Sequence, residues 1–222
     1  MSETTQTIVR SRRCGLRDIY VAKVTKNDAA TYTAGDPVKF ARAINAKISD
    51  TYNHEKIYSD DGVEDTVDTY QGTDIELEVN TLAPQDRALL WNRLYENGFL
   101  VEASEDTPPE VALGFRVRQL NGKYEFAWYY CGRFQLAQDE EYQTVEDKKN
   151  HKTSTVKASF YERAKANSAV DAAGKAIEKH LFRIRVDESN LAADATQAAA
   201  AIKNWFSQVQ EYPGTAQPAQ TE

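Results

Sequence analysis

The stretch from residue 111 to residue 136, VALGFRVRQLNGKYEFAWYYCGRFQL, constrains the fold more than any other part of the chain. Its central pair Asn121-Gly122 favours a two-residue β-turn, because a type I′ turn needs positive φ at both central positions. With that turn, Phe115 lies opposite Trp128 and apolar residues share one face of the ribbon. The stretch therefore predicts a long β-hairpin whose aromatic side chains belong to the core.

Alternating apolar and polar residues predict further strands on both sides of this hairpin. Residues 73–80, TDIELEVN, show the most regular alternation in the chain. The other predicted strands cover residues 18–25, 42–50, 99–104, 141–146, 153–162 and 180–187.

Two helices are also predicted. The first starts at Pro84, which suits a first helical turn, and stops at Asn97-Gly98, which suits a helix end. The second covers the Ala-rich residues 194–209, which carry an apolar stripe. The side chains predicted to fill the core are Leu90, Leu94, Phe115, Val117, Phe126, Trp128 and Trp205.

Two stretches lack a clear period and are predicted to be irregular. Residues 51–72 are acidic and rich in turn formers, but they lack the spacing of an EF-hand loop. Residues 164–179 are Ala-rich and polar, which predicts a loop or a short helix. The expected fold is mainly β: an antiparallel β-sandwich or open barrel of about eight strands, with a flanking helix and a C-terminal helix.

The expected domain organisation has three parts. Residues 1–15 are a polar arm, residues 16–210 form the β-rich domain, and residues 211–222 are polar and expected to be disordered.

Charge and composition disfavour several classes of function. The net charge of −7 disfavours non-specific binding to nucleic acid, which needs Lys and Arg to neutralise phosphate. Cys14 and Cys131 form no CxxC motif and are expected to be free thiols, and the three scattered histidines predict no metal site. There is no apolar run of signal-peptide or membrane-span length, so the cytoplasm is the default location. No nucleotide-binding, hydrolase or zinc-protease motif is present; we expect no cofactor and no enzymatic activity.

Several stretches, taken in order, resemble the major tail tube protein of long-tailed, non-contractile bacteriophages. They are CGLRDIYVAKVT, PVKFARAINAKISD, EKIYSDDGVED, GTDIELEVNTL followed by DRALL, the predicted hairpin, and NWF. The resemblance covers most of residues 14–206 and is weakest at residues 164–179. It rests on the combination and order of the stretches, since none of them is a catalytic motif.

The resemblance implies a structural virion protein with a β-sandwich and a flanking helix. It implies hexameric rings of this chain, stacked into a tail tube through which DNA passes into the host without specific binding. The implied partners are other copies of the chain and the tape measure, terminator and distal tail proteins, with no membrane. The implied location is the virion tail, and the host cytoplasm during assembly.

Two groups of residues are candidates for the roles that a tube requires. The row Asp74, Glu76 and Glu78 could line the lumen, because an acidic lumen repels phosphate. Residues 51–72 could become ordered against a second subunit. The candidates for contacts between subunits or rings are Arg10, Arg12, Arg13, Tyr52, Ile57, Tyr58, Asp60, Asp61 and Val63.

A different class of function stays open at this point. A monomeric β-sandwich could bind a ligand such as a carbohydrate, with Trp128, Tyr129 or Tyr130 as a stacking platform. Rings or tubes of the purified protein would favour assembly, and a persistent monomer would favour the binding module.

Overall fold

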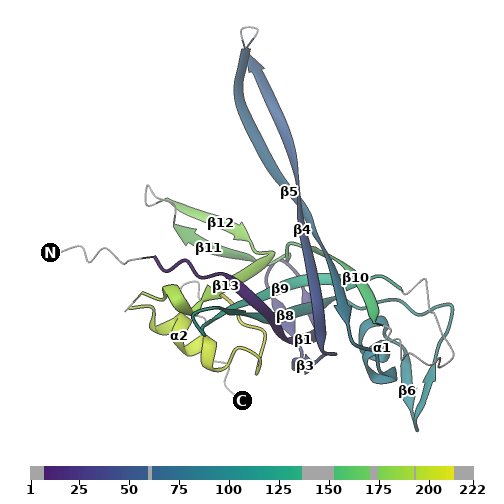
Figure 1. Cartoon of the computed structure of the whole chain (residues 1–222). Helices are drawn as coiled ribbons and strands as arrows, with labels where there is room; N and C mark the ends of the chain where they lie inside the picture. The colour runs from purple at the N-terminus through teal and green to yellow at the C-terminus, as the bar shows by residue number, and fades with distance from the viewer. Residues whose placement is uncertain (1–7, 60–61, 137–152, 171–174, 193, 213–222) are drawn as a thin grey trace, which may run out of the picture.

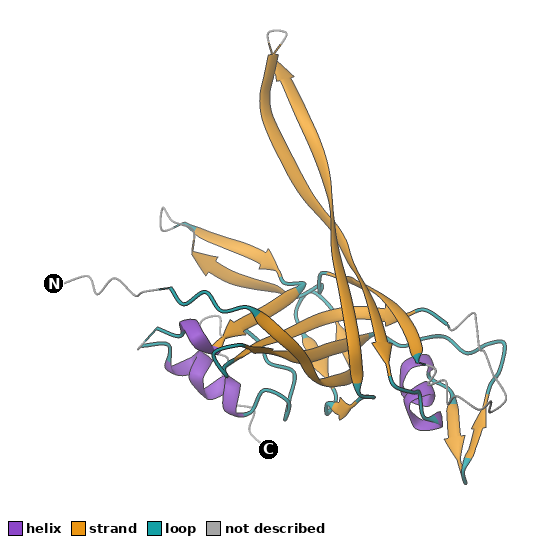
Figure 2. Cartoon of the chain, in the orientation of Figure 1, coloured by secondary structure: helices purple, strands orange, loops and turns teal. Residues whose placement is uncertain are grey.

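The fold is mainly β, as predicted, with nine strands joined in one antiparallel sheet and two short helices (Figure 1, Figure 2). The computed structural model describes residues 8–59, 62–136, 153–170, 175–192 and 194–212. The predicted strand at 141–146 lies outside the described residues.

The sheet has a linear path with two side branches. Its strands are β1 (Arg13–Asn27), β2 (Tyr32–Ala34), β3 (Val38–Lys39), β4 (Ala43–Ser59), β5 (Gly62–Val79), β8 (Val111–Gln119), β9 (Tyr124–Phe134), β10 (Ser154–Tyr161) and β13 (Arg183–Asp187). The path runs β2-β1-β8-β9-β10-β5-β4, while β13 pairs with β9 and β3 pairs with β1.

The remaining elements are smaller. They are two separate hairpins, β6 (Leu94–Glu96) with β7 (Phe99–Val101) and β11 (Ala166–Val170) with β12 (Ala176–His180), the helices α1 (Pro84–Trp91) and α2 (Thr196–Lys203), and the 3-10 turn η1 (Glu188–Asn190).

The predicted hairpin at 111–136 is present as β8 and β9, but its register is shifted by one residue. Phe115 pairs with Ala127, and Trp128 pairs with Gly114. The cause is the geometry of the turn. Within the turn only Gly122 has positive φ, at 84°. The Gln119 N–H donates to the Lys123 carbonyl, so the turn is a three-residue loop. The predicted type I′ turn is therefore wrong.

The shifted register makes both faces of β8 and β9 apolar. Phe115 and Tyr129 point into one core, and Phe126 and Trp128 point into another on the opposite face. The first core is enclosed by the curled sheet and α1, whereas the second is covered by α2 and the residues after it. The buried side chains of the first core include Ile19, Val21, Ile75, Leu77, Val79, Leu90, Trp91, Leu113, Phe134, Val156 and Phe160.

Trp128 joins the sheet to the C-terminal segment. Its Nε1 donates a hydrogen bond of 3.0 Å to the carbonyl of Trp205, which is itself buried, as predicted. The indole lies so close to Gly114 that a Cβ there would come within 2.7 Å of the ring. Because Gly114 has no side chain, the Trp128 ring has room to lie flat on the sheet at this point.

The first helix is shorter than predicted. It ends at Asn92, which has a left-handed φ of 55°. Asn97 and Gly98, with φ of 51° and 83°, form the two-residue turn between β6 and β7 instead of a helix end. Leu94 consequently lies on a hairpin and is exposed, so its predicted place in the core is wrong, while Leu90 is buried as predicted. Val117 is only half-buried.

The C-terminal part also differs from its prediction. Residues 164–179 contain the β11–β12 hairpin, not a loop or a helix. Buried Arg163 lies between the rings of Tyr32 and Tyr130, at 5.0 Å and 4.5 Å from their centroids, and its Nη1 is 3.3 Å from Glu211. Glu211 also accepts from Lys165 Nζ at 3.0 Å, so residue 211 is fixed to the domain and does not begin a disordered tail. Residues 213–222 lie outside the described part of the chain.

An irregularity in β1 builds a small charged cluster. The register shifts between Arg17 and Tyr20, where Asp18 has a φ of 51°. Its carboxylate accepts from Lys39 Nζ at 2.9 Å and from Arg116 Nε at 2.7 Å. Burial alone would raise the pKa of Asp18, but these hydrogen bonds outweigh it and hold the pKa below its ordinary value.

Replacing Gly114 by Ala should lower the free energy of unfolding by about 1–3 kcal/mol, because the new methyl group must displace the Trp128 ring. Thermal melts of the variant would measure this. Gly15→Ala is the matched control, since its Cβ would meet no atom closer than 4.0 Å. Equal melting temperatures of the two variants would contradict the close packing of the Trp128 ring on Gly114.

Asp18→Asn should lower the free energy of unfolding at neutral pH by about 1 kcal/mol. Asparagine tolerates the positive φ, so the loss of stability measures the contribution of the carboxylate charge. Because the folded pKa is lowered, the stabilisation is present above the unfolded value near 3.8 and is lost as pH falls through the folded value. Urea unfolding of both proteins between pH 7 and pH 2 should show the difference vanish in acid. The exposed Asp36→Asn serves as control and should show no difference at either end.

Candidate assembly surfaces

The most prominent feature outside the core is a ribbon formed by the outer halves of β4 and β5. It projects from the body of the protein over residues 51–72 (Figure 1). The prediction of an irregular loop in this stretch is wrong, because cross-strand pairs continue from Thr51–Gly72 to Ser59–Gly62. At roughly 3.3 Å per residue, the nine residues of β4 in this stretch give a ribbon about 30 Å long.

The sequence pattern did not predict this ribbon, because neither of its faces is buried. Tyr52 and Tyr70 are opposite each other, and His54 is opposite Asp68 on the same face, so polar and apolar residues mix on it. Without a buried face, a strand needs no alternation of apolar and polar residues. The exposed apolar side chains on the described part of the ribbon are Tyr52, Ile57, Tyr58 and Val67.

The predicted contact residues 52, 57, 58 and 63 fall on this ribbon. Tyr52, Ile57 and Tyr58 are exposed in β4, and Tyr58 pairs through its backbone with Val63. Asp60 and Asp61 lie outside the described residues. The stretch 51–72 contains six Asp or Glu residues in all and one lysine, so its sequence is strongly acidic.

A polar network fixes the ribbon where it leaves the body. Asp50 accepts from Arg183 and from the Thr73 hydroxyl at 2.7 Å each. Arg183 also donates to the Tyr129 hydroxyl at 3.3 Å, and Tyr70 stacks on Phe182 with a centroid distance of 4.1 Å.

A register shift lies just above this network. The partner of Thr51 is Gly72 and the partner of Tyr52 is Tyr70, so Gln71 is an extra residue in β5. Such a bulge bends and twists a strand pair. The ribbon therefore leaves the sheet at a built-in bend that the network fixes from below.

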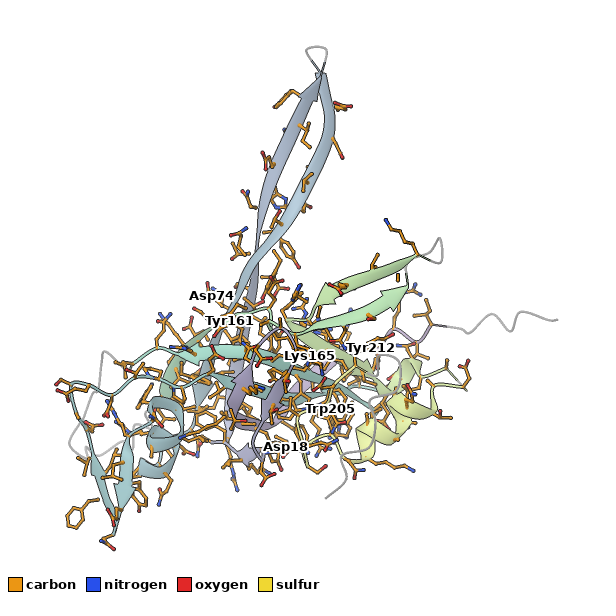
Figure 3. The ribbon with its side chains drawn as sticks, turned by 180° about the vertical axis from the view of Figure 1, so that it is seen from behind. Asp18, Asp74, Tyr161, Lys165, Trp205 and Tyr212 are labelled. Carbon is orange, nitrogen blue, oxygen red and sulfur yellow. The ribbon has the colours of Figure 1, made fainter. Side chains whose placement is uncertain are left out.

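The acidic row lies on the exposed face of the sheet at the foot of the ribbon, where Figure 3 labels Asp74. Glu76 is flanked by Lys47 on β4 and by Lys157 on β10. Asp74 accepts from the Ser159 hydroxyl at 2.7 Å and Glu78 accepts from the Thr153 hydroxyl at 2.8 Å. The face therefore carries both signs of charge. Its position at a lumen stays a prediction.

The described part of the N-terminal arm lies along its own domain. Val9 exchanges two hydrogen bonds with the Asn190 side chain, and the Arg12 carbonyl accepts from the Leu120 N–H. Arg13 already belongs to β1 and forms a two-pronged ion pair with Glu125, at 2.6 Å and 2.9 Å. The arm therefore ends before residue 13, while Arg10 and Arg12 stay exposed.

The aromatic platform considered for a carbohydrate is not accessible. Trp128, Tyr129 and Tyr130 are all fully buried. Sequence reasoning also missed Asp50 and Arg183, which are 133 residues apart and carry no motif. The alternation of apolar and polar residues predicted only that both residues lie in strands.

The described residues contain no cluster of His, Cys, Asp or Glu side chains that could hold a metal ion, and Cys14 and Cys131 are free thiols. No helix in the described part of the chain is long and apolar enough to cross a membrane. No protein-family model matches the chain, and no curated protein matches it either.

Arg183→Ala should loosen the foot of the ribbon, because it leaves the half-buried Asp50 without its cation. The loss of this partner should destabilise the network by about 1–3 kcal/mol. Hydrogen exchange should accelerate in residues 51–58 and 64–70 and change little in β8 and β9. The exposed Arg118→Ala removes the same charge elsewhere on the sheet and should leave the ribbon unaffected. Unchanged exchange of the ribbon in Arg183→Ala would show that the network does not hold it.

Proposed function

We propose that this chain is a structural subunit that assembles with copies of itself into a tube, as the major tail tube proteins of long-tailed bacteriophages do. The observation that carries the proposal is the projecting β4–β5 ribbon. An isolated two-stranded ribbon is marginally stable in water, yet this one extends beyond the body with Ile57, Tyr58 and Val67 exposed. Contact with a second subunit would bury these side chains.

The charge of the ribbon also supports a protein partner. All six acidic residues of the stretch 51–72 lie from Glu55 to Asp68. Such a segment is matched by a basic surface, and Arg10 and Arg12 provide exposed cations on every copy. Opposite charges between subunits would select the register of one copy on the next.

The tube itself comes from the sequence resemblance. In this proposal the chain forms hexameric rings that stack into the tail tube, in the virion tail and before that in the host cytoplasm. The exposed row Asp74, Glu76 and Glu78 lines the lumen, where carboxylates disfavour lasting contact with phosphate. Tape measure, terminator and distal tail proteins are the further partners.

The purified chain should form rings or tubes as its concentration rises, visible by negative-stain microscopy and sedimentation. A variant in which a two-residue turn replaces residues 53–69 keeps the Tyr52–Tyr70 pair at the foot, and it should stay folded and lose stacking. Raising the salt concentration should weaken assembly of the full chain, because exposed ion pairs are screened.

Hydrogen exchange supplies an independent measurement. Residues 51–58 and 64–70 should exchange measurably faster in the dilute subunit than in the assembled sample. A full chain that stays monomeric at every concentration, with equally fast exchange in the ribbon, would contradict the proposal.

A further inference from the structure

A cavity of about 300 Å³ opens on the inner side of the sheet, between β1, β4, β8 and β9. Its floor is apolar and its rim is charged. Arg13, Glu125 and Arg185 form the rim. The floor consists of Leu16, Ile44, Ala46, Ile48, Phe115, Val117 and Ala127.

The cavity exists because the curled sheet does not close. In the described residues, β4 pairs only with β5, and residues 13–17 of β1 pair only with β8. The two free edges therefore face each other across an opening. Apolar residues that would be covered in a closed barrel, such as half-buried Val117 and exposed Ile44, line that opening instead.

The same chain carries an apolar projection at the other end of the β8–β9 hairpin. The β6–β7 hairpin lies beside α1 (Figure 1), and the Trp91 Nε1 of α1 donates to the carbonyl of Gln135, beyond the end of β9. Phe99 at its tip is 71 % exposed, the largest fraction among the large apolar side chains of the described residues. Leu94 and Val101 form a cross-strand pair on the same face and are also exposed.

This projection is held rigidly. Arg93 lies over the Trp91 ring, 4.7 Å from its centroid, and pairs with Glu102. The Tyr95 hydroxyl accepts from Gln85 of α1 at 2.9 Å. A side chain presented on a fixed hairpin loses little conformational entropy when it binds, so Phe99 is placed as a knob and not as a mobile end.

We propose that the β6–β7 hairpin of one copy docks on the cavity of a second copy, with Phe99 inserted over Phe115 and Val117. The size fits, because a cavity of roughly 150 Å³ already accommodates a benzene ring. The charges fit as well: exposed Glu96 is the cross-strand partner of Phe99, and Arg185 is exposed on the rim.

The contact is heterologous, since the knob and the cavity are different surfaces of one chain. Such contacts repeat from copy to copy and build rings or filaments instead of closed dimers. This inference rests on the proposed self-assembly and adds a defined contact to it, separate from the β4–β5 ribbon.

Photo-crosslinking tests the contact directly. A benzophenone side chain at residue 99 is aromatic and should enter the cavity of a neighbour. The variant is mixed with ¹⁵N-labelled wild-type chain at assembling concentration, irradiated and digested. Mass spectrometry should find crosslinks to labelled peptides containing residues 44–48 or 115–117, whereas crosslinks only to other labelled peptides would overturn the docking.

Two sets of variants give a second readout. Phe99→Asp should raise the concentration for half-assembly at least about tenfold, because tenfold corresponds to only about 1.4 kcal/mol and burial of a Phe side chain exceeds that. Leu120→Asp is the matched control, since Leu120 is 69 % exposed on another hairpin turn, and it should change nothing. Glu96→Arg and Arg185→Glu should each weaken assembly, and the double variant should recover it.

The outcomes separate the two proposals. If the wild-type chain never assembles, the proposed function fails and this contact fails with it. If the wild-type chain assembles and Phe99→Asp assembles at the same concentration, only the docking of β6–β7 is overturned.

Discussion

The contact between the Trp128 indole and the backbone at Gly114 determines how the rest of the protein packs. The ring lies flat on the outer face of β8 and β9, and its Nε1 donates to the carbonyl of Trp205. This contact attaches α2 and the following residues to the sheet, so the central hairpin is covered on both faces. The inner face curls around its own core with β4, β5 and β10, and this curled sheet carries the ribbon, the open cavity and the acidic row.

The two Asn-Gly pairs of the chain show what could be predicted from the sequence and what could not. Both lie in turns of the structure, but only the pair at residues 121–122 was predicted to be a turn. At residues 121–122 we expected a two-residue turn and found a three-residue loop; at residues 97–98 we expected a helix end and found the two-residue turn with positive φ at both positions. Local preference identifies a turn, but the strands that flank it decide its type. One added residue moved Phe115 and Trp128 to opposite faces.

Strands with one buried face were predictable, as residues 73–79 of β5 show. The outer half of the same strand was not, because no described residue of the chain covers it and its sequence shows no alternation. The network at its foot joins Asp50 to Arg183, and no local pattern connects residues so far apart. The exposure of Phe99 was missed for a related reason: it follows from the turn at Asn97-Gly98, which was predicted to be a helix end.

The position of β5 has a consequence for how the chain is made. The β4–β5 hairpin is local and can form early, but β10, which covers the other edge of β5, begins 75 residues after β5 ends. During synthesis that edge is open, and an open strand edge pairs readily with other chains. Asp74, Glu76 and Glu78 lie along this part of β5, where like charges repel an identical strand from another copy. On this view the acidic row protects the nascent protein from aggregation until Lys157 arrives on β10 beside Glu76.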